Sequence, residues 1–599
     1  MLQRLAMSPV FPCATVLAGL LMMTTNPLVA EQPGQPSGAG QADHDTDNPA
    51  GACEPSLMGS PYIPVDSWVY PAVLRLYSLG FVDTVYLGMR PWTRSSVNNM
   101  LDEVQDRIED GGSGPAADEA QRIYDALTRE LHFDTDGPCM AHEGKSRVES
   151  VYSVERAISG TPLRDSFHLG STVVNDYGRP YASGFNDYSG ASGYASAGRF
   201  LLYARGEFQG APSATGYSTA LAQTLANSDG TIDYINSTTP IPLNQLTTIP
   251  VGPIAAATYG RLMEAYASAH YLNHEISFGK QDDWLGPGLG GAMAYSNNAE
   301  NIYSFRINRI EPLDIPLLSR ISGPFRYEFL VGSLKGHAFP NDPWVHVEKV
   351  SFRPTKDLEF GFERTVIWGG KGHEPITLHT FLRSFFSLSA PSGAIKNSPQ
   401  DPGARFGAFD FSWRLPFVRN WLALYADSEV HDDVSPIDAP RRASWRPGLY
   451  LSHVPGVPKL DIRAEAASTD PPVSTSNAGH FMYYEQIQRQ GYTNQGQLFG
   501  DWIGREDKGG QGWITYHLSG NEWFQVGVRS QKAAKDFIPG GTTLNDIDFQ
   551  VVKRIGKDFE LNGKFAYERW KAPIYLPGQQ TVTTTTIQLT WFPEKNVRF

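Results

Sequence analysis

The feature that most constrains this chain is an alternation of apolar and polar residues that recurs from about Gly144 to the C-terminus. Successive side chains of a β-strand point to opposite faces, so this alternation predicts strands with one apolar and one polar face. In residues 199–208 one face carries Phe200, Leu202, Ala204 and Phe208, and the other carries Arg199, Tyr203, Arg205 and Glu207. Residues 408–414, 460–466 and 547–551 repeat the pattern.

The length of the alternating region separates two fold classes. A water-soluble β-sandwich also alternates, but a chain of this size would divide into domains of about 100 to 200 residues. No linker-like stretch interrupts the roughly 450 residues after Gly144, and no later apolar stretch reaches the roughly 20 residues of a membrane-spanning helix. We therefore predict a mainly β fold, a large antiparallel transmembrane β-barrel of about 16 to 18 strands whose polar faces line the lumen.

The N-terminal region is predicted to contain three parts. Residues 1–30 are typical of a signal peptide, with Arg4 before a short apolar run and a small-residue site ending at Ala30; a retained membrane anchor is the alternative. Residues 31–59 are rich in Gly, Pro, Gln and Asp and predict a flexible leader. Residues 60–143 predict a small α-helical bundle, which we expect in the periplasm, and residues 144–599 form the barrel with long loops.

Helix signals within residues 60–143 are specific enough to place three helices. Asp66 is expected to cap the first, which ends at Gly80, and Thr93 is expected to cap the second, which ends at Gly111. Pro115 precedes the third, over residues 116–131.

The net charge argues against a nucleic-acid partner, and the cysteine content suggests a disulfide. The formal net charge of -13 argues against nucleic acid, because phosphate binding requires a basic surface. Removal of the signal peptide takes one of the three cysteines and leaves Cys53 and Cys139, an even number in an oxidising compartment. We predict a disulfide between them.

Two motifs suggest cofactor or metal chemistry, and each has a simpler explanation. His270 and His274 have the spacing of helical zinc ligands, but on a strand this spacing separates the side chains by about 13 Å. The glycines of residues 286–291 satisfy a nucleotide-binding pattern, yet Pro287 and the lack of a following helix favour a tight loop. We predict neither a metal ion nor a cofactor.

Acidic residues also suggest catalysis without supporting it. Asp282 and Asp283 adjoin Trp284, but adjacent residues on a strand point to opposite sides and so do not act together. A second set, Asp427, Glu429 and His431, shares one face near a strand end, where a solvated barrel rim is expected. The chain has no nucleophile motif of the GxSxG type. We therefore predict no catalytic residue.

Three segments are too long for tight turns and predict surface loops or a plug: residues 209–253, 369–403 and 468–512. Each contains a short helical pattern, such as residues 218–227 or 376–386. The third concentrates aromatic and charged residues, namely Tyr483, Tyr484, Tyr492, Trp502, Arg505, Glu506 and Asp507. Such residues suit stacking on sugar rings and binding of hydroxyls, and an aromatic girdle at the membrane interface is an equal alternative.

Ordered motifs across the chain resemble a known family. They are Val65-Asp66-Ser67 with Leu74-Arg75-Leu76 and Arg90-Pro91; Phe278-Gly279-Lys280 with Trp284-Leu285-Gly286-Pro287-Gly288 and Ser296-Asn297-Asn298-Ala299; Gly491-Tyr492-Thr493-Asn494 with Gly500-Asp501-Trp502-Ile503-Gly504-Arg505; and Glu568-Arg569-Trp570-Lys571-Ala572-Pro573. Together they span roughly residues 60 to 593, and the chain resembles the Wzi family of capsule assembly proteins. It looks longer than the best-known enterobacterial members, chiefly in its loops.

The resemblance implies a lectin-like barrel in the outer membrane of a Gram-negative-type bacterium, binding surface polysaccharide and attaching or assembling it there without enzymatic chemistry. Its partners would be the polysaccharide, outer-membrane lipid and a polysaccharide export complex. We predict polysaccharide-binding roles for Tyr484, Tyr492, Trp502, Arg505 and Asp507, and structural roles for the motif residues Trp284, Gly286, Pro287, Gly288, Ser296, Asn297 and Asn298. The alternatives are an oligosaccharide-permeable porin and a surface glycoside hydrolase or lyase.

Overall fold

The computed structural model describes residues 58–110, 114–135, 144–231, 245–387, 391–433, 435–473, 477–593 and 596–598. The predicted signal peptide, the predicted leader up to residue 57 and both cysteines of the predicted disulfide, Cys53 and Cys139, lie outside these residues. Within the described ranges, no helix has the length and apolar character needed to cross a membrane.

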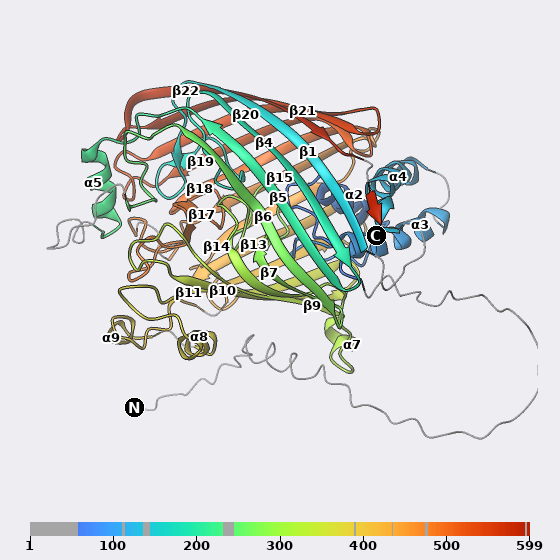
Figure 1. The fold of residues 1–599 in the computed structure, drawn as a ribbon, viewed down its shortest axis with the longest axis horizontal. Coiled ribbons are helices and arrows are strands. Elements are labelled where there is room, and N and C mark those ends of the chain that lie inside the picture. Colours follow the sequence, from blue (N-terminus) through green and yellow to red (C-terminus); the bar gives the residue numbers. More distant parts are fainter. Residues whose placement is uncertain are drawn as a thin grey trace, which may run out of the picture.

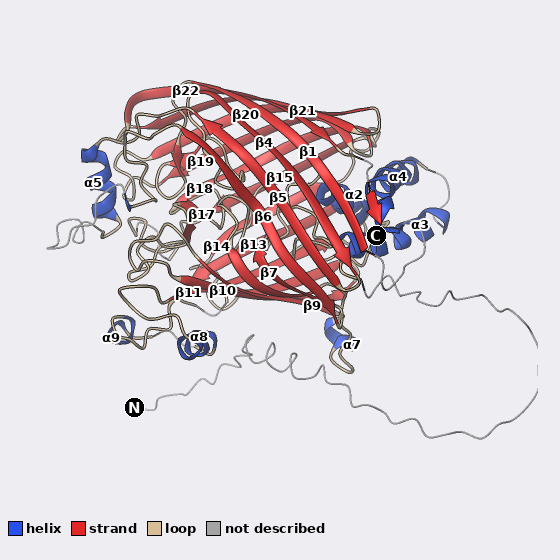
Figure 2. Cartoon of the chain, viewed as in Figure 1, coloured by secondary structure: helices blue, strands red, loops and turns tan. Residues whose placement is uncertain are grey.

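The described strands form a closed barrel (Figures 1 and 2). The sheet has 19 strands, and without the three-residue β23 (Asn596–Arg598) it consists of 18, each antiparallel to the next along the chain. The barrel closes because β1 pairs with both β4 and β22. The predicted fold class is confirmed.

The 18 strands have the following bounds: β1 Gly144–Ser159, β4 Gly184–Ala197, β5 Phe200–Ala211, β6 Ala257–Tyr271, β7 His274–Lys280, β8 Tyr303–Arg309, β9 Phe325–Ser333, β10 Trp344–Thr355, β11 Leu358–Trp368, β12 Ala404–Arg414, β13 Leu422–His431, β14 Ser444–Leu451, β15 Leu460–Ser468, β18 Asp507–Ser519, β19 Glu522–Ala533, β20 Thr542–Ile555, β21 Phe559–Ala572 and β22 Leu576–Trp591. Four two-residue strands lie in the connections: β2 Arg164–Asp165 pairs with β3 Gly170–Ser171, and β16 Thr493–Asn494 pairs with β17 Gln497–Leu498.

Along the strands, apolar side chains are exposed on the outside and polar side chains are buried inside, the reverse of a water-soluble sheet. On β5, Phe200 and Leu202 are 69% and 62% exposed, whereas Arg205 and Glu207 are 7% and 5% exposed. The predicted alternation in β12, β15 and β20 is likewise confirmed, with the polar faces inside. An outward apolar surface around a polar interior is typical of a barrel that spans a membrane, because a charge facing lipid costs about 2 to 4 kcal/mol at the midplane.

Three helices precede the barrel: α2 (Val69–Leu79), α3 (Arg94–Asp110) and α4 (Pro115–Thr135). Gly80 ends α2 in a left-handed conformation, and the Thr93 side chain accepts a hydrogen bond from Ser96 N at the start of α3, as predicted. The predicted cap by Asp66 is wrong. The Asp66 carboxylate instead pairs with Arg205 on β5, 2.9 Å away, because a buried cation is a stronger partner than a helix end.

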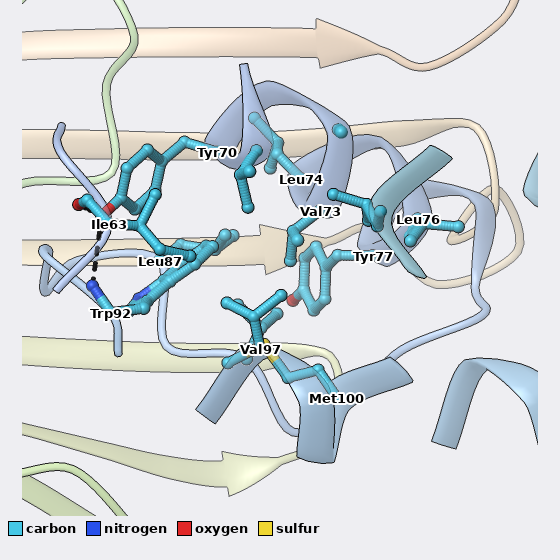
Figure 3. Close-up of a cluster of buried hydrophobic side chains, with 14 of the residues drawn as sticks. Ile63, Tyr70, Val73, Leu74, Leu76, Tyr77, Leu87, Trp92, Val97 and Met100 are labelled. Carbon is cyan, nitrogen blue, oxygen red and sulfur yellow. Dashed lines mark hydrogen bonds between the residues drawn. The ribbon is translucent and has the colours of Figure 1, made fainter. Parts of the chain in front are cut away.

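The helices lie at one end of the barrel, which we call the helix end (Figure 1). Their apolar faces meet in a buried cluster around Tyr70, Val73, Tyr77 and Trp92 (Figure 3). The same cluster includes barrel residues such as Met263, Trp284, Tyr425 and Tyr450. Polar contacts add to the docking: Glu359 of β11 accepts hydrogen bonds from Leu87 N and Gly88 N at 2.7 and 3.1 Å, and Arg414 of β12 donates to Tyr77 O at 2.7 Å. The helical segment and the barrel therefore share one core.

The opposite end, which we call the loop end, carries the predicted long loops with α5 (Thr219–Ser228), α8 (Leu378–Phe385) and α9 (Gly393–Lys396) (Figure 1). The described parts of these loops lie within residues 212–256, 369–403 and 469–506. The helical patterns at residues 218–227 and 376–386 are confirmed, whereas the described residues of the 469–506 loop contain no helix, so the helical pattern expected there is wrong. A further short helix, α7 (Ser319–Ser322), lies in the connection between β8 and β9 at the helix end.

Candidate functional site

The lumen is filled by a segment in which the sequence predicted only a tight loop, at residues 286–291. Residues 281–302 connect β7 to β8, and every residue from 281 to 299 except Leu289 is buried. The loop of residues 469–506 packs against this segment: Tyr483 donates a hydrogen bond to Met293 O at 2.6 Å, and Tyr492 donates to Ala294 O at 2.7 Å. We call residues 281–302 the plug.

Arg446 of β14 holds the plug to the barrel wall. Its guanidinium lies 2.9 Å from Glu465 on β15 and 2.8 Å from Asp501 in the 469–506 loop, and all three side chains are 0% exposed. Glu465 in turn accepts hydrogen bonds from Leu289 N and Gly290 N at 2.8 and 3.0 Å. One buried arginine thus joins two strands, the plug and a loop. Such a network is stable only when every charge keeps its partner.

Gly290 lies at the tightest point of this network. A Cβ there would collide with the side chains of Gln511, Trp513 and Arg446, so a larger residue would have to displace groups of the Arg446 network. Its carbonyl accepts a hydrogen bond from Trp502 Nε1 at 2.7 Å. The glycine pattern in residues 286–291 therefore serves close packing in the plug and is followed by no helix.

The family-motif residues lie in the plug and make contacts that support their predicted structural role. Arg90 and Trp284 exchange two backbone hydrogen bonds, and Arg90 donates to the carbonyls of Pro287 and Gly288. Ser296 donates to Gly500 O at 2.6 Å, Asn298 donates to Leu498 O at 2.9 Å, and the carbonyl of Asn297 accepts from Tyr177 N. A Cβ on Gly286 would collide with Asp427. The motif links the plug to the helical segment and to the loops.

The residues predicted to bind polysaccharide are all buried. Tyr484 is 8% exposed, Tyr492 and Trp502 are 0% exposed, and Arg505 and Asp507 are 1% exposed. Their side chains point into the protein, so they form no aromatic belt on the outer barrel surface, and that alternative is wrong. Their assignment to polysaccharide contacts stays a prediction; the structure places them where they order the loops.

Arg505 connects the loops at the loop end. It donates to Asp229 after α5 at 2.7 Å and to Gly479 O at 2.8 and 3.0 Å. Its guanidinium also lies over the rings of Phe167, Tyr484 and Phe537 at 4.2, 5.1 and 4.7 Å. The contacts come from four connections of the barrel, so this one side chain fixes their relative positions.

His168 completes the same cluster. Its Nδ1 lies 3.0 Å from Asp165, its Nε2 lies 2.9 Å from Asp229, and the ring is 0% exposed. Burial alone would lower the pKa of His168, but the two carboxylates outweigh it and raise the pKa to about 9. Burial likewise opposes ionisation of Asp229, yet His168 and Arg505 hold its pKa below the ordinary value. We call Arg505, His168, Asp165 and Asp229 the loop clamp.

The loop clamp predicts loss of loop order at alkaline pH. Because the pKa of folded His168 lies above its ordinary 6.5, the protonated ring stabilises the loops fully below about pH 6.5, and this contribution is lost as pH rises through about 9. The shift corresponds to about 3 kcal/mol. Trypsin cleavage within residues 469–506 should therefore accelerate between pH 7 and pH 10. His168→Gln, which does not titrate, should show no such acceleration, and equal profiles for the two proteins would contradict the assignment.

The acidic and histidine patterns of the sequence have structural roles. Asp427, Glu429 and His431 are 1%, 0% and 6% exposed, so the expected solvated rim is wrong; the plug and the 469–506 loop cover this part of β13. Asp282 accepts hydrogen bonds from Val65 N and Tyr177 Oη, and Asp283 pairs with Arg306.

His270 and His274 do not converge on one site. His270 lies 3.5 Å from Glu275, and His274 contacts the Tyr327 hydroxyl at 2.6 Å. No group of three or more metal-ligating side chains occurs among the residues that the structure describes.

Comparison with known families gives a direct match. The family model described as "Capsule assembly protein Wzi" matches residues 153–585, which is most of the barrel. The chain belongs to the Wzi family. The match covers the plug, the 469–506 loop and all but the ends of the barrel, so the architecture described above is that of a Wzi family member.

Relatives of the chain are distant in sequence. A protein from Klebsiella pneumoniae described as an uncharacterized 55.8 kDa protein in the cps region is 24% identical over 172 residues, which are 28% of this chain and 33% of the relative. This match thus spans about a third of the relative's length. The structure of Wzi from Escherichia coli, described as an outer membrane protein involved in group 1 capsule assembly and a carbohydrate binding β-barrel, has a TM-score of 0.62 at 16% identity, covering 88% of this chain and 99% of that chain. At that identity the likeness shows the fold. OccAB3 from Acinetobacter baumannii has a TM-score of 0.37 at 10% identity, covering 76% of this chain and 99% of that chain.

Proposed function

We propose that this protein binds surface polysaccharide and attaches or assembles it at the bacterial surface, without cleaving it. Membership of the Wzi family supports this function, and the E. coli relative is described as carbohydrate binding. The observation that carries the proposal is the plugged lumen: residues 281–299 except Leu289 are buried, and Glu465, the partner of Arg446 on the wall, accepts hydrogen bonds from Leu289 N and Gly290 N. A barrel filled in this way suits a rigid platform for loops better than a pore.

The platform presents its loops at one end, and we propose that this end faces the cell exterior. The barrel, residues 144–599, then lies in the outer membrane with its apolar face against lipid, and the helical segment, residues 60–143, lies in the periplasm. A polysaccharide export complex is the partner that would deliver the polymer. Residues 1–30 act as the export signal and residues 31–59 as a leader.

Polymer contacts in this proposal come from exposed groups that the ordered loops present. Phe386, at the end of α8, is 58% exposed, and the Lys371 side chain is 78% exposed. An exposed ring suits stacking on a sugar, and an exposed ammonium suits hydroxyls or carboxylates of a polymer. The buried predicted contacts Tyr484, Tyr492, Trp502, Arg505 and Asp507 act by holding these loops in place.

The test is binding of the purified protein to the surface polysaccharide of its own bacterium. We expect saturable binding, with the chain length of the polymer unchanged after incubation. Shortening of the polymer would instead indicate a glycoside hydrolase or lyase, and failure of the correctly folded barrel to bind would remove the proposal.

A further inference from the structure

A cavity of about 630 Å³ lies at the helix end of the lumen, away from the loops. It is bounded by the start of α2, by Leu289 and Gly290 of the plug, and by the inner faces of β18 to β22. The cavity reaches Gly520 in the β18–β19 turn, Glu130 of α4 and Phe592 after β22, which places its edge at the helix end. Its volume falls in the range of about 300 to 1,000 Å³ that is typical of small-molecule sites.

The wall of this cavity differs in chemistry from the wall that holds the plug. The inner faces of β10 to β15 carry buried ion pairs, such as Lys349 with Asp410 at 2.6 Å and Arg446 with Glu465. The inner faces of β18 to β22 at the cavity carry mostly neutral side chains, namely Trp513, Thr515, Trp523, Gln525, Gln550, Asn562, Gln588 and Thr590, together with the ionisable His517, Glu560 and Lys564. Outward neighbours such as Phe524 and Phe549 are each 41% exposed, which confirms that these polar residues face inward.

Strand register arranges these groups as a row that Lys564 interrupts. Gln525 lies opposite Thr515 and Gln550 on its two neighbouring strands, Gln550 lies opposite Lys564 on β21, and Asn562 lies opposite Gln588. Gln525 donates to Thr515 Oγ1 at 2.9 Å, and Gln550 donates to Asn562 Oδ1 at 3.0 Å. These bonds hold the amides in fixed orientations along the wall.

The row retains hydrogen-bonding groups for a ligand. Within the part of the chain that the structure describes, the side-chain carbonyls of Gln525, Gln550 and Gln588 accept no hydrogen bond, because each bond made by these residues uses the NH₂ group. Charged groups around the cavity have partners within the protein: Asp66 pairs with Arg205 at 2.9 Å, and Asp461 pairs with His517 at 2.6 Å. On the wall itself, Glu560 pairs with Arg554 at 3.1 Å and Lys564 pairs with Asp548 at 3.5 Å. The groups that remain for a ligand are neutral amides and partly exposed indole rings.

We propose that this cavity is a second binding site, for a short uncharged saccharide at the helix end of the barrel. Indole rings offer flat apolar faces on which the C–H face of a sugar ring stacks, and amides both donate to and accept from hydroxyl groups. A charged sugar would find no unpaired counter-charge among the groups named above. The site lies at the opposite end from the loops, so it goes beyond the proposed function and does not depend on polymer binding there.

The test is calorimetric titration of the full-length protein, purified in lauryldimethylamine oxide so that no detergent sugar competes. The probes are cellotriose, maltotriose and mannotriose, the acidic trigalacturonic acid, and oligosaccharides released by partial hydrolysis of the bacterium's own surface polysaccharide. We expect saturable binding of a neutral probe and at least about tenfold weaker binding of the acidic one. Trp523→Ala and Gln550→Ala should each lower the affinity of the protein for the neutral probe at least about tenfold.

Two further variants distinguish loss of the binding site from a general loss of folded protein. Phe524→Ala removes the neighbouring ring on the outer face of the same strand and should bind like the wild type, and Trp523→Phe should retain most of the affinity because it keeps an aromatic face. Absence of binding by every probe, or equal binding by Trp523→Ala and Phe524→Ala, would overturn the proposal. Loss of oligosaccharide binding in Trp523→Ala with unchanged polymer binding would support two independent sites. If the protein did not bind the polymer at its loops, binding of the neutral oligosaccharide in the cavity would still be expected.

Discussion

Arg446→Ala should destabilise the barrel by about 3 to 5 kcal/mol, because it leaves Glu465 and Asp501 buried without their cation. Both carboxylates are 0% exposed, so water cannot replace the guanidinium without opening the plug. We expect a lower midpoint of urea unfolding in detergent. We also expect single-channel conductance in planar bilayers, which the wild-type protein should lack, because the released plug no longer fills the lumen.

The matched control for this variant is Arg442→Ala. Arg442 lies four positions earlier and pairs with Asp433 at 3.2 Å, but its side chain is 41% exposed. Exposed ion pairs contribute about 0 to 1 kcal/mol, so this variant should unfold close to the wild type. Equal unfolding midpoints for the Arg442 and Arg446 variants would show that the Arg446 network does not hold the plug.

Arg505→Ala should release the loops while leaving the barrel folded. The variant removes the hydrogen bonds to Asp229 and Gly479 and leaves Asp229 with His168 alone, at a cost of about 3 kcal/mol to the ordered loops. Opening of the loops should become about 100-fold more frequent, measured as faster trypsin cleavage after Arg489, the site within residues 469–506 that the variant keeps. The urea midpoint of the barrel strands should change little.

A charge-matched control accompanies the Arg505 variant. Lys508→Ala removes a cation three residues away that pairs with Asp470 at 2.7 Å but is 59% exposed, and it should not change loop cleavage. Arg505→Lys should not restore order, because one ammonium cannot satisfy Asp229, Gly479 and three rings together. If trypsin cleaved the Arg505→Ala variant no faster than the Lys508→Ala variant, contacts other than those of Arg505 would hold the loops.

The barrel was predictable from the sequence because the alternation of apolar and polar residues can be seen within each strand by itself. Phe200, Leu202 and Arg205 alternate within a few residues, and lipid and lumen impose the same rule on every strand. Loop boundaries followed from where this alternation stops, as at Trp368 and Ala404, which end and begin β11 and β12.

The plug and the loop clamp were not predictable in the same way, because their partners are far apart in the chain. Arg446 and Asp501 are separated by 55 residues, and Arg505 and Asp229 by 276. Local periodicity does not indicate which distant residues form a pair, so the contacts of His168, Asp229 and Arg446 could not be predicted from a single sequence. Residues 286–291 were predicted as a tight loop because of Pro287 and the glycines, and no local signal showed that these glycines allow the close packing of a plug.

The most direct test of the central claim is polysaccharide binding by the purified protein, measured together with conductance on the same preparation. The account predicts saturable binding of the bacterium's own surface polysaccharide by the wild type, weakened in Arg505→Ala and unchanged in Lys508→Ala, with intact polymer and no steady channel current. A wild-type barrel that conducts steadily and binds no polysaccharide would contradict the account and would indicate a porin.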